Sequence, residues 1–295
     1  MIQLLVPIII AVALAGATSV KRYVPDASLV DWGPDVESHE EFRFPFAAKY
    51  DDGRKRLFYV AGDHSSGMGP NLKTVKAMFD ELKPQAVLVE GMTTEGDFAY
   101  RNWGVEDFAK DGFRGTSESP YAVWLASRRG LPVRGGEPSP RRTLREVRRR
   151  GYSEQDLLGF FTVRMVPGWT REGVVGDEAA FRVMASRELG DDRRRLGVKA
   201  RFGYEELLAW YERMTPGVPL REVRYEHMGP EADGTRLQRL SFAVDQARQT
   251  RFNGQLENLL GRFDRVLVVF GGSHLCRERR MLERLLGPPT NVKPF

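Results

Sequence analysis

The sequence predicts an α/β fold with a mostly parallel central sheet flanked by helices and an α-helical insertion in the middle of the chain. Short apolar runs alternate with amphipathic segments near both ends of the chain. Such runs are typical of parallel strands that helices cover on both faces. The stretch between them, residues 141–236, has the pattern of helices alone. We therefore expect one sheet whose strands come from two separate parts of the chain.

The first βαβ part of this core is expected at residues 56–140. Its elements follow from apolar runs, from apolar positions recurring every three or four residues, and from proline and glycine at the ends of segments. In order, they are a strand at Arg56–Gly62, a helix at Asn71–Pro84, a strand at Gln85–Gly91, a helix at Pro120–Gly130 and a strand at Leu131–Glu137.

The insertion at residues 141–236 should contain helices at 153–166, 177–189 and 204–214, with a loop or hairpin over 221–234. The core should resume at 237–295 with a long helix (Leu237–Phe263), a strand (Arg265–Phe270), a helix (Arg277–Leu286) and a short edge strand (Asn291–Phe295). Residues 18–55 show no clear period and are expected to form an extended lead-in.

Residues 1–17 have the pattern of a signal peptide or a membrane anchor. An apolar run from Ile2 to Ala15 ends in Ala15-Gly16-Ala17, a small-x-small cleavage pattern. Lys21 and Arg22 follow the run, which also suits an anchor formed by residues 2–20. We expect an exported protein, periplasmic or secreted, with membrane association through the N-terminus as the alternative.

Composition limits the classes of partner. The 45 Lys and Arg exceed the 40 Asp and Glu by a net charge of only +5. The arginine runs at 140–150 and 191–201 lack the interleaved aromatic residues that stack on single strands, so no nucleic-acid partner is expected. The single cysteine, Cys276, excludes an internal disulfide and a cysteine-cluster metal site. The oligomeric state is left open.

Charged side chains and histidines stand where the predicted parallel strands end. His64, Glu90, Glu137 and His274 each stand at the end of one of these strands or just after it. Ligands of such sheets bind at the carboxyl ends of the strands, so these side chains are expected to converge. They could hold a divalent metal such as zinc or manganese, or perform general acid/base chemistry without one. The segment Met92–Ser119, rich in aromatic residues, is expected to cover this rim as a substrate-binding loop.

Three stretches carry a resemblance to a known family: "YVAGDHSSG", "GLPVRGGEPSP" and "RFNGQLENLLGRFDRVLVVFGGSHL". They resemble the TraB/GumN/Tiki group within the EreA/ChaN-like (erythromycin esterase-like) superfamily. The terminal Gly-x-x-His motif is complete at His274, Glu90 and Glu137 fit the two glutamate positions, and Arg251 fits the arginine before the last strand. The first motif departs, because Ala61 stands where the family has glycine before His64. The resemblance covers about the first third and the final sixth of the mature chain.

The resemblance implies a hydrolase that cleaves an amide (peptide) or ester bond in a peptide or small-molecule substrate. His64, Glu137 and His274 would hold a divalent metal or a water, and Glu90 would orient a histidine or act as general base. Arg251 would neutralise charge that develops on the carbonyl oxygen. Two alternatives stay open. One is a ChaN-like binder of haem or another flat cofactor with His64 or His274 as axial ligand, and the other is a non-catalytic member.

Overall fold

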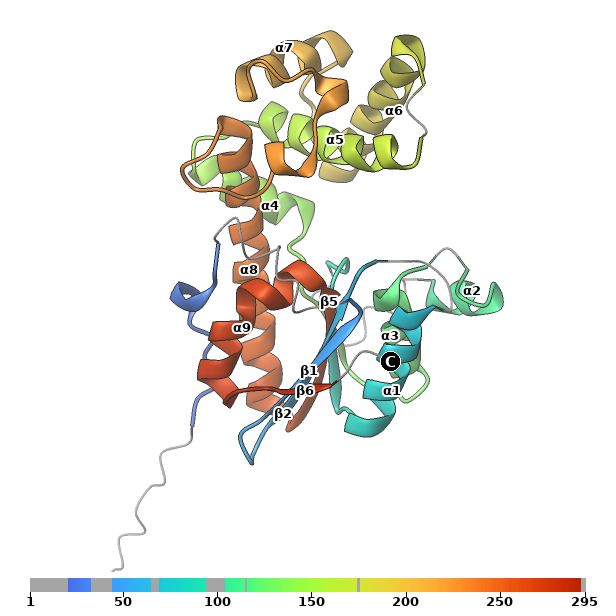
Figure 1. Cartoon of the computed structure of the whole chain (residues 1–295), viewed down its shortest axis with the longest axis vertical. Coiled ribbons are helices and arrows are strands. Elements are labelled where there is room, and N and C mark those ends of the chain that lie inside the picture. The colour runs from blue at the N-terminus through green and yellow to red at the C-terminus, as the bar shows by residue number, and fades with distance from the viewer. Residues whose placement is uncertain are drawn as a thin grey trace, which may run out of the picture.

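The computed structural model describes residues 21–32, 44–64, 69–93, 104–114, 116–173 and 176–292. The predicted signal peptide or anchor lies outside these residues, as does much of the predicted lead-in. Within them, no helix is both long enough and apolar enough to cross a membrane. An α/β core carries a lobe of helices above it, and one long helix runs through both (Figure 1).

The core contains a six-stranded sheet in the order β4-β3-β5-β2-β1-β6. The neighbours β4, β3, β5 and β2 pair in parallel, whereas β1 is antiparallel to both β2 and β6. The strands are β1 (Phe46–Asp51), β2 (Arg56–Gly62), β3 (Ala86–Val89), β4 (Val133–Gly135), β5 (Arg265–Gly271) and β6 (Thr290–Val292). This confirms the predicted fold class. β1 is a correction, because it falls within the segment expected to be an extended lead-in.

Helices cover both faces of the sheet, as the apolar strands require. Side chains alternate along β5, so that Val266, Val268 and Phe270 face one apolar core while Leu267 and Val269 face the other. The first face is covered by η1 (Ala27–Leu29), α9 (Gly272–Leu286) and the C-terminal half of α8 (Arg236–Arg262). The second is covered by α1 (Pro70–Leu82), α2 (Val105–Lys110) and α3 (Glu118–Ser127).

The insertion is helical and has an apolar core of its own. It consists of α4 (Pro140–Arg149), α5 (Glu154–Arg171), α6 (Glu178–Leu196), α7 (Tyr204–Met214) and two short 3-10 turns, η4 (Leu220–Glu222) and η5 (Tyr225–His227). The side chains of Ser153 and Asp156 form a capping box that fixes the start of α5. The 3-10 turns occupy the segment that was expected to be a loop or hairpin.

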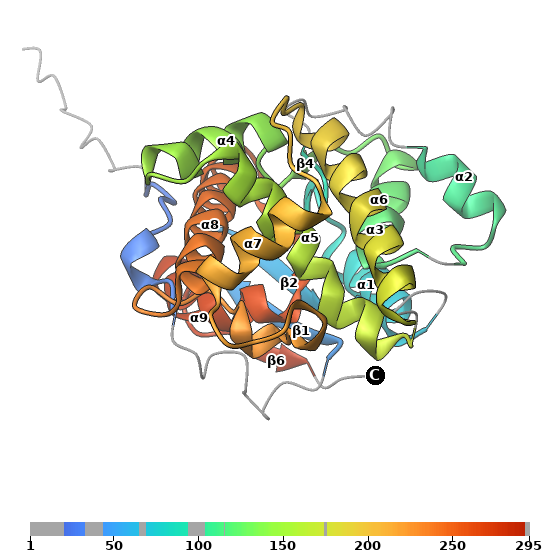
Figure 2. The ribbon, with the colours of Figure 1, turned by 90° about the horizontal axis from the view of Figure 1, so that it is seen from above.

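Helix α8 joins the two bodies. Its N-terminal residues Leu237 and Val244 pack in the core of the insertion, whereas Phe252 and Leu260 pack against the sheet. The charged residues Asp245 and Arg248, whose side chains are only 12% and 11% exposed, lie between these two halves. Seen from above, α5 and α7 lie over the strands (Figure 2). The insertion is thus held above the carboxyl ends of the parallel strands, where the predicted site residues stand.

Candidate functional site

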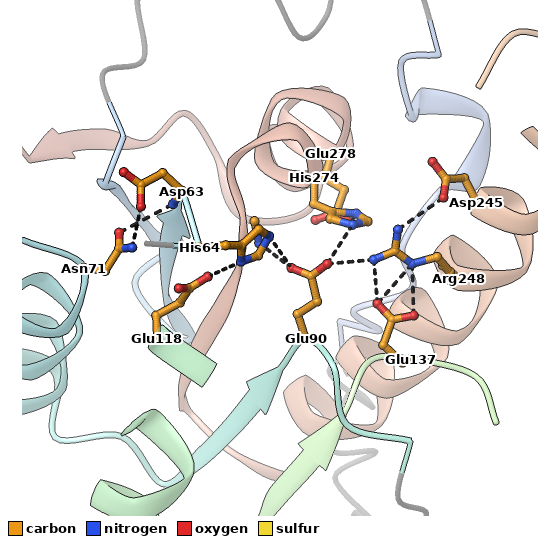
Figure 3. Close-up of polar contacts among 11 residues, drawn as sticks. Asp63, His64, Asn71, Glu90, Glu118, Glu137, Asp245, Arg248, His274 and Glu278 are labelled. Carbon is orange, nitrogen blue, oxygen red and sulfur yellow. Dashed lines mark hydrogen bonds and ion pairs between the residues drawn. The ribbon is translucent and has the colours of Figure 1, made fainter. Parts of the chain in front are cut away.

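The ends of the four parallel strands bring His64, Glu90, Glu137 and His274 together (Figure 3). Glu90 lies in the middle. Its Oε2 is 3.7 Å from Nε2 of His64, and its Oε1 is 3.5 Å from Nε2 of His274. The backbone N–H of Gly271 donates to Oε2 of Glu90 at 2.6 Å. His274 lies in the first turn of α9, because this helix begins at Gly272, earlier than predicted.

Two glycines at the strand ends make room for these contacts. A Cβ on Gly271 would lie 2.6 Å from Nε2 of His64, and a Cβ on Gly62 would lie 2.5 Å from Oε1 of Glu118. A side chain at either position would therefore push apart groups of the site. This explains why glycine stands at 62 in this chain, next to the fully buried Ala61. His64 itself has a φ of 60°, a left-handed conformation that costs a non-glycine residue about 1 kcal/mol.

Arg248, on α8, forms ion pairs with three carboxylates of the site. This role of Arg248 was not predicted from the sequence. Its Nη2 donates to Oε1 of Glu90 at 2.7 Å, and its Nε and Nη2 both donate to Glu137, at 3.0 and 2.7 Å. Its Nη1 donates to Oδ1 of Asp245 at 3.2 Å, and Oδ2 of Asp245 accepts from Nη1 of Arg277 at 2.9 Å. Three carboxylates thus face two guanidinium groups, which leaves an excess of negative charge beside the histidines.

These charges shift the pKa values of the cluster. Burial disfavours the charge of Glu90, but the neighbouring His274, Arg248 and His64 outweigh it and hold the pKa of Glu90 well below its usual range. In the same way, Arg248 and Arg277 lower the pKa of Asp245 against the effect of burial. The three carboxylates that surround Arg248 raise its own pKa well above its usual value, although burial opposes this. Glu90 is therefore ionised across the physiological pH range.

Arg251 is expected to neutralise charge that develops on the substrate carbonyl oxygen, but the arginine of α8 that contacts the glutamates and lines the cleft is Arg248, three residues earlier. Arg251 is buried on α8 with 8% of its surface exposed, and it does not line the cleft into which His64 and His274 open. Asp245, Arg248 and Arg251 recur every third residue and so form one stripe of charge along the helix. That stripe was a signal for a buried charge cluster, but the sequence alone does not say which arginine faces the glutamates.

Each histidine is backed by a buried glutamate. Oε1 of Glu118 lies 2.7 Å from Nδ1 of His64, and Oε1 of Glu278 lies 4.0 Å from Nδ1 of His274. Both glutamates are fully buried. Glu118 and, more weakly, the charge of Glu90 raise the pKa of His64 against the effect of burial. Burial raises the pKa of Glu278 to about 7. Neither glutamate was predicted, because each stands within a helix, where a glutamate is commonly exposed.

The site opens into a cleft of about 470 Å3 between the core and the insertion. His64, Glu90, Ser273 and His274 line its floor, and α5 and η5 supply most of its roof. Larger hollows exist, including one of about 720 Å3 on the insertion, but neither His64 nor His274 lines the described ones. The perturbed titratable groups favour the smaller cleft as the functional one.

The segment Met92–Ser119 does not form the roof in its described part. None of its described residues lines the cleft. Phe113 packs against Tyr121 and Trp124 in the apolar core on the second face of the sheet, beside α1, α2 and α3. Its aromatic residues Phe98, Tyr100 and Trp103 lie outside the described residues. The prediction of a substrate-binding loop is therefore corrected for the described part, because Phe113 completes an apolar core and Phe108 is exposed on α2 away from the cleft.

The side chains expected to bind a metal ion, His64, Glu137 and His274, are not arranged to do so. Both oxygens of Glu137 accept from Arg248, whose guanidinium would repel a cation at that position. Among the described residues, no group of three or more His, Cys, Asp or Glu side chains is placed to hold an ion. A flat cofactor would have to reach His64, whose side chain is 55% exposed, rather than His274 at 8%.

No family model matches the chain, and no curated protein is significantly similar to it. The function proposed below therefore depends on the geometry of the site.

Replacing Arg248 with methionine should destabilise the protein by about 3–5 kcal/mol, because it leaves buried carboxylates without their counter-charge. The stability of Arg248→Lys should lie between that of wild type and that of Arg248→Met, since lysine restores the charge but not the paired hydrogen bonds. Urea unfolding measures both. Arg262→Met, at an exposed arginine of the same helix, is the control, and an equal loss there would contradict a special role for Arg248.

Glu278 should make the protein less stable as the pH rises. A carboxyl whose pKa is about 7 in the folded state and 4.5 in the unfolded state binds its proton more tightly when folded. Stability is therefore lost between these two pH values, by about 3 kcal/mol in total. Glu278→Gln should remove this dependence in unfolding measured from pH 4 to pH 8, whereas Glu283→Gln on the same helix should keep it. Parallel pH profiles for wild type and Glu278→Gln would contradict the assignment.

Proposed function

We propose that the protein is a hydrolase that cleaves an amide (peptide) or ester bond in this cleft, with His64 as the general base. The observation that carries the proposal is the contact of 2.7 Å between the buried Glu118 and Nδ1 of His64. A carboxylate at Nδ1 favours the imidazole tautomer with its proton on that nitrogen. Nε2 is then left as a proton acceptor on the side of the cleft.

His64 would take the proton of a water molecule as that water attacks the substrate carbonyl. The imidazolium ion that forms would lie between two carboxylates, Glu118 at Nδ1 and Glu90 at 3.7 Å from Nε2. Both stabilise its charge, which agrees with the raised pKa of His64. Glu90 is a poor base because its pKa is low. Its role is to orient the histidines and to stabilise the charged intermediate.

The developing oxyanion would be stabilised from the floor of the cleft. Helix α9 begins at Gly272, directly beside the histidines, and Ser273 lines the cleft. The first N–H groups of a helix have no partner within it and carry partial positive charge. Such N–H groups stabilise the negative charge that forms on a carbonyl oxygen in the transition state. The protonated His64 can then donate the proton that it took from water to the leaving group.

The resemblance to the TraB/GumN/Tiki group supports a hydrolase, since four of the five residues on which it rests lie in this site: His64, Glu90, Glu137 and His274. Zinc or manganese at His64, Glu137 and His274, and haem at His64, are the alternatives to metal-free chemistry. A Soret band on adding haem would favour the second of these. Activity that a chelator abolishes and zinc or manganese restores would favour the first, and would require Arg248 to release Glu137.

Variants of the His64–Glu118 pair test the proposed role. On whichever member of a panel of aryl esters and peptide amides the wild type cleaves, His64→Gln should lower kcat/KM by about 10²- to 10⁴-fold, the usual contribution of a general base. Glu118→Gln should shift the acid limb of the pH–rate profile to lower pH, because Glu118 is the main group that raises the pKa of His64.

The exposed Glu106→Gln on α2 is the matched control and should leave the profile unchanged. A folded His64→Gln variant with wild-type kcat/KM would overturn the proposal. So would a wild type without activity on any member of the panel.

A further inference from the structure

One face of α5 forms much of the roof of the cleft. Four of the residues that it contributes recur every three or four positions, the spacing of a single helical face: Phe160, Arg164, Gly168 and Arg171. Met165, next to Arg164, also lines the cleft. This face lies opposite the histidines on the floor of the same cleft. A ligand that fills this cleft therefore contacts both His64 and α5.

Arg164 and Arg171 are positioned to bind a ligand. Both are exposed, and among the described residues neither donates a hydrogen bond or forms an ion pair. They are seven residues apart, and so about 10 Å apart along the helix axis. The other two arginines of the cleft, Arg248 and Arg277, are bound to carboxylates. Two cations in one cleft without a hydrogen-bonded counter-charge favour the entry of an anion.

The surrounding acids leave room for that anion. Asp245 lines the cleft, but Arg248 and Arg277 already occupy both of its oxygens. Glu90 is held by Arg248 and Gly271 in the same way. Glu172, just after the end of α5, also lines the cleft, but it is exposed, so water and salt screen its repulsion of an anion. Burial of the Arg164 guanidinium and then the charge of Arg248 lower the pKa of Arg164, and Asp245, Glu137 and Glu90 offset this only in part, so a further negative group beside it would relieve the remaining repulsion.

The roof also offers apolar contact and open space. Met165 is 42% exposed and Tyr225 is 54% exposed, and both line the cleft. Gly168 lies on the same face of the helix between the two arginines, and a Cβ there would meet no atom within 4 Å. The absence of a side chain at Gly168 leaves a gap that a ligand can occupy. Exposed apolar side chains around such a gap favour a ligand with an apolar body.

We propose that the cleft takes a substrate with an apolar body and an anionic head group, a carboxylate or a phosphate, that Arg164 and Arg171 bind. Guanidinium groups bind either head group through paired, charge-assisted hydrogen bonds. Met165 and Tyr225 contact the apolar body, and the body extends from the roof towards His64. This inference rests on the proposed hydrolase function only for the identity of the bound molecule as a substrate.

Binding of three unreactive probes tests the proposal without requiring turnover. The probes share an aryl-propyl body and differ in the head group: 4-phenylbutyrate, 3-phenylpropylphosphonate and the neutral 4-phenylbutanamide. Calorimetry should show at least one anionic probe binding wild type about 100-fold more tightly than the amide, or about tenfold for each charged contact. The preferred head group identifies the substrate as a carboxylate or a phosphate compound.

Arg164→Met and Arg171→Met should each weaken binding of that anionic probe about tenfold and leave amide binding unchanged. Arg213→Met, at an exposed arginine of α7 outside the cleft, should have no effect. Gly168→Leu should block all three probes by filling the gap. Gly261→Leu is its control, since a Cβ at this other helical glycine also meets no atom within 4 Å.

Equal binding of the amide and the anions by wild type, no binding of any probe, or unchanged anion binding in both arginine variants would each overturn the inference. Anion binding as expected, without cleavage of any ester or amide, would contradict the proposed hydrolase alone. Cleavage that depends on His64 but ignores Arg164 and Arg171, with no preference for anionic substrates, would retain the hydrolase and reject the anion site.

Discussion

The organisation of the site depends on the ion cluster around Arg248. Its guanidinium binds Glu90 at the end of β3 and Glu137 after β4, and it also holds Asp245 on its own helix. Removing these charges from water is costly, and only the paired hydrogen bonds and mutual attraction offset that cost. Because Arg248 lies where α8 passes from the insertion to the sheet, the same contacts fix the insertion above the strand ends and keep Glu90 ionised.

The ionised Glu90 organises two histidines whose surroundings differ. His64 is half exposed in the cleft and has Glu118 close to Nδ1, whereas His274 is buried and Glu278 is 4.0 Å away. Proton transfer to a substrate requires a histidine that the substrate can reach, so His64 is better suited to that role. The raised pKa of Glu278 places a second titrating group behind His274, where its charge would influence the whole cluster.

In the proposed hydrolase, chemistry and selectivity would come from different parts of the chain. The strand ends carry the acid/base groups, while α5 of the insertion presents two arginines and an apolar surface to the same cleft. Because α8 is continuous through both bodies, the distance between floor and roof is set by one helix rather than by a flexible linker. A roof built on a helix also positions its side chains more rigidly than a loop would.

The sequence by itself determined the alternation of strands and helices, the helical character of the insertion and the position of four polar residues at strand ends. These follow from local periodicity and from the rule that parallel strands end at one edge of the sheet. Tertiary structure decided that Arg248 rather than Arg251 meets the glutamates, that Glu118 and Glu278 stand behind the histidines, and that α5 covers the cleft in place of the described part of residues 92–119. The reason is that local patterns specify which face of an element is apolar, but the rotation of a helix and its neighbours across the fold are set by packing between segments far apart in the chain.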